Sequence, residues 1–132
     1  MIQRSRVLII EPDLGLRAQA VVALRRQYLV TLADDGMQGY ALALQYHPDA
    51  IVTEFRMQGW SGLQLLEQLR KHRVLKSVPV IILTADNRKT TFAEALNAGA
   101  NSYLLKSHFS GESLIEKVQG VLSSRSENPS FV

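Results

Sequence analysis

Short apolar runs alternate along this chain with longer segments of helical period, and this alternation restricts the fold more than any other feature. Continuous apolar runs are typical of strands buried on both faces, and apolar residues at every third or fourth position are typical of helices packed on a sheet. We expect strands at Val7–Ile10, Leu29–Leu32, Ile51–Thr53, Val78–Leu83 and Tyr103–Leu105, and helices at Leu14–Gln27, Met37–Tyr46, Gly62–His72, Lys89–Ala98 and Gly111–Ser123. The pattern predicts an α/β fold with a doubly wound, five-stranded parallel sheet.

The length is that of one domain. A chain of 132 residues with 46% hydrophobic and 20% charged residues can bury a core, and it lacks the composition of a disordered protein. No cysteine is present, which excludes disulfides and thiolate chemistry. We expect the domain to span residues 1–122, and the polar segment 123–132, with Pro129, to form a flexible tail or the start of a linker.

The chain has a formal charge of +3, and its charges give little support to nucleic-acid binding. The basic cluster falls where the third helix should end, so we interpret it as a solvated helix terminus; it comprises Arg70, Lys71, His72, Arg73 and Lys76. No helix is left over to read DNA once five cover the sheet. No long apolar segment predicts a membrane span, and we expect a cytoplasmic protein.

Several polar residues are placed to begin helices. Ser61, Ser110 and either Asp86 or Asn87 are candidate N-caps, because their side-chain oxygens can accept from free backbone amides. Asp13 is a better candidate for the cap of the first helix than for a ligand. On the fourth helix we expect Phe92 and Leu96 to pack in the core.

Chemically active side chains follow the ends of four predicted strands. They are Glu11 and Asp13, Glu54 and Arg56, Thr84, and Lys106. In a doubly wound sheet these carboxyl ends meet at one edge, where such folds bind their ligands. Carboxylates, a hydroxyl and an ammonium together suit a phosphoryl group and its metal ion.

Five motifs in order resemble the receiver domains of bacterial two-component response regulators, over residues 6–122. They read VLIIEPD, PDAIVTE, GWSGLQLLEQLR, VPVIILTA and AGANSYLLKS. The resemblance implies the CheY-like strand order 2-1-3-4-5 with helices on both faces, and Glu54 at the phosphoacceptor position. It implies a switch made of Thr84 and Tyr103 beside the small Ala85, and a functional Lys106. It also implies protein partners, a histidine kinase or an effector domain, on the face of the fourth helix, fifth strand and fifth helix, and it leaves a homodimer open.

Four departures from the family pattern concern its chemistry. Pro12 replaces a metal-binding acid, Glu54 replaces the acceptor aspartate, and Gln58 and Ser107 replace prolines. Glu54 and Glu11 remain as weak metal candidates, and Mg²⁺, which needs near-ideal octahedral geometry, should bind poorly or not at all. The extra methylene of Glu54 shifts its oxygens by about 1.5 Å, enough to impair an in-line transfer.

The sequence leaves alternatives open at this site. Glu54 either mimics a phosphorylated acceptor or forms a silent ion pair with Lys106, and Arg56 either replaces the charge of the metal or points to solvent. We favour a non-enzymatic receiver-like module that acts by protein binding. The alternatives are a regulator that still accepts phosphate with Mg²⁺ and a flavodoxin-like cofactor binder, which the acidic EPDLGLR segment disfavours. We further expect Lys106 within ion-pair reach of Glu11 or Glu54, and a trans Lys106–Ser107 peptide.

Overall fold

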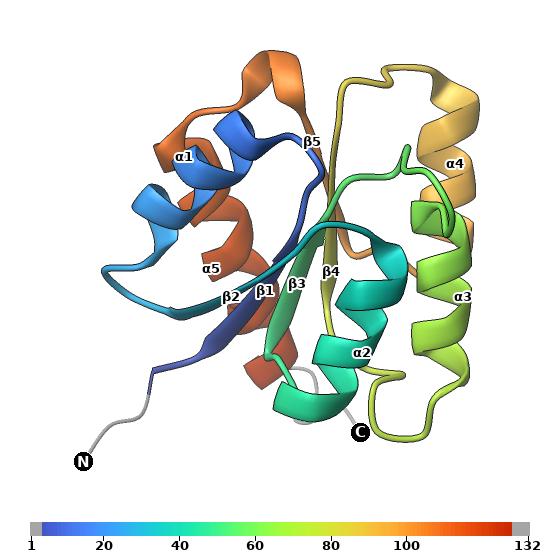
Figure 1. Cartoon of the computed structure of the whole chain (residues 1–132), viewed down its shortest axis with the longest axis horizontal. Helices are drawn as coiled ribbons and strands as arrows, with labels where there is room; N and C mark the ends of the chain where they lie inside the picture. Colours follow the sequence, from blue (N-terminus) through green and yellow to red (C-terminus); the bar gives the residue numbers. More distant parts are fainter. Residues whose placement is uncertain (1–3, 128–132) are drawn as a thin grey trace.

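The computed structural model describes residues 4–127, which form one parallel sheet covered by helices on both faces (Figure 1). The strand order is β2-β1-β3-β4-β5, as the sequence predicts, with β2 at an edge. The strands are β1 (Arg6–Ile10), β2 (Leu29–Ala33), β3 (Ala50–Thr53), β4 (Val80–Thr84) and β5 (Ser102–Leu105). The helices are α1 (Leu14–Leu24), α2 (Gly36–Tyr46), α3 (Gly62–Lys71), α4 (Lys89–Asn97) and α5 (Gly111–Glu127), with a short 3₁₀ turn at Lys106–His108.

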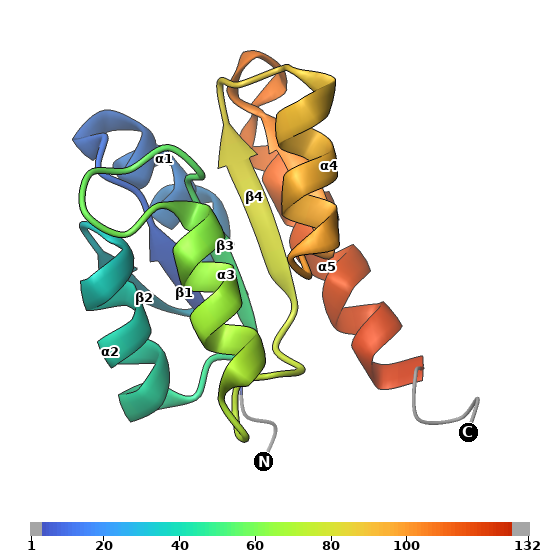
Figure 2. The ribbon, with the colours of Figure 1, turned by 90° about the vertical axis from the view of Figure 1, so that its right-hand side faces the viewer.

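The sheet separates two apolar cores. Helices α2, α3 and α4 cover one face and α1 and α5 the other, which Figure 2 shows from the side of α3 and α4. Successive strand residues point to opposite faces, so Leu8 and Ile10 enter the first core while Val7 and Ile9 enter the second. Central strands must therefore be apolar at every position, which explains their continuous apolar runs.

Three boundaries differ from the sequence prediction by more than one residue. Helix α1 ends at Leu24 instead of Gln27, because the amides of both Gln27 and Tyr28 turn back to the carbonyl of Leu24. Strand β4 begins at Val80 instead of Val78, whose amide closes a turn onto Leu75. Helix α5 continues to Glu127, so a tail beginning at residue 123 is wrong for 123–127, and 128–132 lie outside the described residues.

Three of the four predicted helix caps are confirmed. The side chains of Asp13, Ser61 and Ser110 accept from the amides of Leu16, Gln64 and Ser113. The prediction for α4 is wrong, because its N-cap is Arg88, which makes no side-chain cap. Asp86 accepts from the amide of Arg88 one turn too early to cap the helix, and its other contacts belong to the site described below.

Two predictions about packing are wrong. Arg70 is not a solvated helix-end cation, because its guanidinium donates to the carbonyls of Gly99 and Val78 and to the side chain of Asn101. Burial lowers the pKa of Arg70. Phe92 and Leu96 are not core residues, since they are 46% and 42% exposed. Helix α4 is short, and its buried side is taken by Thr91 and Ala95.

The backbone agrees with two further expectations. Among residues 4–127 no peptide bond is cis, so the Lys106–Ser107 bond is trans as predicted. Within the same range no helix combines the length and the apolar character that a membrane span requires.

Close packing of α2 on β1 leaves no room for a side chain at Gly39. A Cβ there would lie 2.7 Å from Cγ1 of the fully buried Ile10. We predict that Gly39→Ala lowers the free energy of unfolding by about 1–3 kcal/mol through overpacking. Gly120→Ala is the matched control, because nothing lies within 4 Å of its added Cβ in α5. It should stabilise by up to about 1 kcal/mol in urea unfolding, and equal effects of both changes would contradict the packing argument.

Candidate functional site

Three strands deliver charged side chains to one buried point. Glu11 follows β1, Glu54 follows β3 and Lys106 follows β5, all at the carboxyl ends of the parallel strands. The ammonium of Lys106 lies 2.8 Å from Oε1 of Glu54 and 3.1 Å from Oε1 of Glu11. The predicted ion-pair reach is therefore present, and it holds with both carboxylates.

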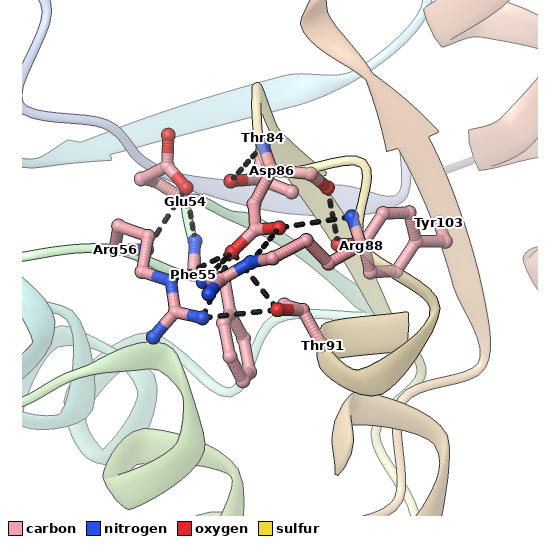
Figure 3. A network of polar contacts seen from close by, with 8 residues as sticks. All are labelled: Glu54, Phe55, Arg56, Thr84, Asp86, Arg88, Thr91 and Tyr103. Carbon is pink, nitrogen blue, oxygen red and sulfur yellow. Dashed lines mark hydrogen bonds and ion pairs between the residues drawn. The ribbon is translucent and has the colours of Figure 1, made fainter. Parts of the chain in front are cut away.

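The carboxylate of Glu54 is engaged at both oxygens. Oε1 takes the ammonium, while Oε2 accepts from the backbone amides of Phe55 at 2.5 Å and Arg56 at 2.9 Å (Figure 3). The side chain is thus turned back onto its own loop, and Glu54 is 6% exposed. A carboxylate held in this way is a fixed structural anion that faces its own chain.

Glu11 is the more deeply buried of the two acids, at 2% exposure. Its Oε2 accepts from the amide of Asp13 at 3.1 Å and from Lys106 at 3.2 Å. Burial raises the pKa of Glu11, and although the Asp13 amide and Lys106 oppose it, the pKa stays above its usual range. Burial would lower the pKa of Lys106, but the hydrogen bonds and charges of Glu54 and Glu11 outweigh it and raise that pKa.

The donor set at this point does not fit a magnesium site. Pro12 brings no carboxylate, and the exposed Asp13 spends its side chain on the cap of α1. Both remaining acids are bound to Lys106, and within residues 4–127 no cluster of three or more potential ligands is found. Mg²⁺ prefers oxygen ligands at near-octahedral positions, which two carboxylates neutralised by an ammonium do not offer.

A second polar cluster, the Asp86 cluster, lies beside the first and was not anticipated from the sequence. Oδ2 of Asp86 accepts from the guanidinium groups of Arg56 at 2.8 Å and Arg88 at 2.7 Å and from the hydroxyl of Thr91 at 2.9 Å (Figure 3). The cluster joins the loop after β3, the loop after β4 and the first turn of α4. Its only signal in the sequence was an acid between two arginines that lie far apart along the chain.

Both predicted switch residues contact the Asp86 backbone. The hydroxyl of Thr84 accepts from the amide of Asp86 at 3.3 Å, and the hydroxyl of Tyr103 donates to its carbonyl at 2.9 Å. Thr84 is buried, and Ala85 is exposed beside it. The loop after β4 is therefore held from the strand side and from β5 at once.

Arg56 follows neither of the two expectations for it. Its backbone amide binds Glu54, but its guanidinium reaches away to Asp86 and to the hydroxyl of Thr91 at 3.0 Å. The positive charge beside Glu54 comes from Lys106 alone. Gln58, at a departure from the family pattern, is exposed in the same loop.

The comparisons with known proteins agree with the fold and with the position of this site. A family model, "Response regulator receiver domain", matches residues 7–119. The chain belongs to this family. Receiver domains carry signals in two-component systems, and the chain is such a domain.

Similar proteins come from several bacteria. The phosphate regulon regulatory protein PhoB of Pseudomonas aeruginosa is 28% identical over 117 residues, which cover 88% of this chain and 51% of PhoB. The chemotaxis protein CheY-3 of Vibrio cholerae is 34% identical over 89 residues, which cover 67% of this chain and 68% of CheY-3. The chain thus spans about half the length of PhoB and two thirds of CheY-3.

A solved structure gives the same picture. The receiver domain of a sensor histidine kinase from Pseudomonas aeruginosa superposes with a TM-score of 0.84 at 28% identity, covering 92% of this chain and all of the other. That structure holds a magnesium ion coordinated in its active-site cleft. The difference in chemistry between the two receiver domains therefore lies in side chains and not in the path of the strands.

The ammonium of Lys106 balances two buried carboxylates, so its removal should be costly. We predict that Lys106→Met lowers the free energy of unfolding by about 1–3 kcal/mol at neutral pH, because Glu11 and Glu54 then repel each other without a counter-ion. Guanidinium unfolding measures the change, and Lys71→Met on the exposed end of α3 should stay within about 0.5 kcal/mol. Adding Glu11→Gln to Lys106→Met should recover part of the loss; no recovery would contradict the charge argument.

The Asp86 cluster predicts a pH dependence at the acid end. The side chain and amide of Arg88, with help from Arg56 and Thr91, hold the pKa of Asp86 far below its ordinary value of 3.8. The ionised carboxylate therefore stabilises the fold above that ordinary value, and the contribution is lost as pH falls below it. Asp86→Asn should remove this part of the acid destabilisation, seen as a flatter dependence of the melting temperature on pH from about 5 to 2. A parallel pH profile for both proteins would refute the assignment.

Proposed function

We propose that this receiver domain signals by binding proteins and not by accepting a phosphoryl group, with the Glu54–Lys106 ion pair standing where a phosphorylated acceptor and its lysine would meet. Glu54 is the residue that carries the proposal. An acceptor needs a carboxylate oxygen free to attack in line and a metal that neutralises the donor. Here one oxygen is bound to Lys106 and the other to two backbone amides.

The Asp86 cluster supports a fixed switch. In receiver domains the loop after β4 changes with the state of the site, so groups that hold this loop set the output. In this chain Arg56 links the loop of Glu54 to Asp86, and Tyr103 donates to the carbonyl of Asp86. We propose that these bonds hold one conformation without phosphate, and that a partner selects or releases it.

The partner surface that we propose is the face of α4, β5 and α5. A cavity of about 360 Å³ there includes Phe92, Tyr103 and Leu105 in its lining. Arg88, Lys89 and Lys117 also line it and make it basic. Exposed aromatic side chains ringed by cations suit a partner that presents apolar and acidic groups, such as a kinase or an effector domain.

The proposal includes weak or absent Mg²⁺ binding, and a double reversion tests it. Pro12→Asp restores the missing ligand, and Glu54→Asp shortens the acceptor so that it no longer reaches its own loop amides. We predict that the unmodified chain keeps its mass with acetyl phosphate and Mg²⁺, while the double variant gains about 80 Da. Intact mass spectrometry measures the gain, and Trp60 emission, three residues from the loop helix α3, follows Mg²⁺ binding.

The single variants serve as controls. Each should stay unphosphorylated, since a metal ligand without a correctly placed acceptor, or an acceptor without the metal, lacks one requirement of the transfer. Arg56 is already held by Asp86, so no third change should be needed. If the unmodified chain binds Mg²⁺ and takes up phosphate on Glu54, the alternative stands and this is a phosphoaccepting response regulator.

A further inference from the structure

Strand β2 is an open edge of the sheet that lacks the usual protection. It pairs with β1 on one side only, and it lies between α1 and α2 (Figure 1). Exposed edge strands generally carry lysine, proline or a bulge that prevents another strand from pairing with them. The strand here reads LVTLA, without charge or proline, and Leu29 and Leu32 are 48% and 41% exposed.

The uncharged surface continues onto the neighbouring helix. Helix α2 reads GMQGYALALQY, eleven residues without an acid or a base, and its outward side exposes Met37, Ala41 and Leu44. In the register with β1, Leu29 and Thr31 point to the face that carries α2, whereas Val30 and Leu32 point to the face that carries α1. The edge of β2 and the outside of α2 thus form one apolar surface, which we name the β2 edge.

The charges that bound this strand have an ordered arrangement. The segment 25–35 reads RRQYLVTLADD, with two cations before the strand, two anions after it and no charge between them. Arg25 and Arg26 are exposed, and within residues 4–127 neither forms an ion pair. Asp34 contacts Arg17 and is still 67% exposed. The pattern is antisymmetric about Val30.

We propose that a second copy of this chain binds along the β2 edge, strand to strand and antiparallel, about a two-fold axis at Val30. Such a pairing places each residue opposite the one whose number completes 60. Val30 then faces its own copy, Leu29 faces Thr31, and both arginines face aspartates, Arg26 to Asp34 and Arg25 to Asp35. The two sheets join into one, as in other self-complementary edges.

The charge pattern selects this occupant. A copy aligned in parallel would place arginines beside arginines and aspartates beside aspartates, whereas the antiparallel copy makes four opposite-charge pairs across the interface. An unrelated extended peptide would satisfy the strand's backbone but has no reason to match both ends. The β2 edge lies on the other side of the sheet from β5, so the dimer is independent of the proposed partner surface and of the phosphoacceptor question.

The first test measures self-association of the whole chain by sedimentation over a range of concentrations. The unmodified chain should form a dimer that weakens as salt rises. Arg25→Glu with Arg26→Glu turns four attractive pairs repulsive and should weaken the dimer about tenfold or more. Lys71→Glu with Arg73→Glu, the same charge change on exposed residues after α3, should leave it unchanged.

The second test uses complementary charges in two different chains. One carries Arg25→Glu and Arg26→Glu; the other carries Asp34→Lys and Asp35→Asn, where asparagine keeps the cap of α2. Each should be monomeric alone, and their mixture should form a heterodimer, because only the mixed pair meets opposite charges at both ends. A monomeric unmodified chain, or a reversed chain that dimerises as tightly as the unmodified one, would overturn the proposal.

Discussion

The ammonium of Lys106 is the interaction on which the site depends. It is the one cation in contact with two carboxylates that are each almost fully buried, Glu11 and Glu54. Buried acids without a counter-ion carry a desolvation cost of several kcal/mol, so the geometry at the ends of β1, β3 and β5 is stable because this charge is present. The lysine thereby joins three strands at the edge where the family binds its ligands.

A second centre of charge controls the loops around the first. Asp86 holds Arg56 from the loop after β3 and Thr91 from α4, and its backbone receives Tyr103. The loop that carries Glu54 and the loop that leads to α4 are therefore fixed to each other without any ligand. A change at either loop must break charge-assisted hydrogen bonds, which makes the pair a coupled element through which partner binding can act.

Most of the fold and part of the site were predictable from the sequence, for identifiable reasons. Continuous apolar runs such as Val7–Ile10 mark strands buried on both faces, and the caps Asp13 and Ser61 mark helix starts through local hydrogen bonds. Phe92 was assigned to the core on apolarity alone and is exposed, because α4 is short and buries only Thr91 and Ala95. Arg70 was assigned to solvent on its charge and is bound to the carbonyls of another turn.

The sequence by itself determined the strand order and the meeting of Glu11, Glu54 and Lys106, since parallel strands bring their carboxyl ends to one edge whatever lies between them. Only the tertiary structure decided how each side chain used its position. Glu54 folds back onto the amides of Phe55 and Arg56, and the guanidinium of Arg56 goes to Asp86, thirty residues away. Such choices depend on rotamers and on distances between loops, and neither is encoded in the local pattern of residues.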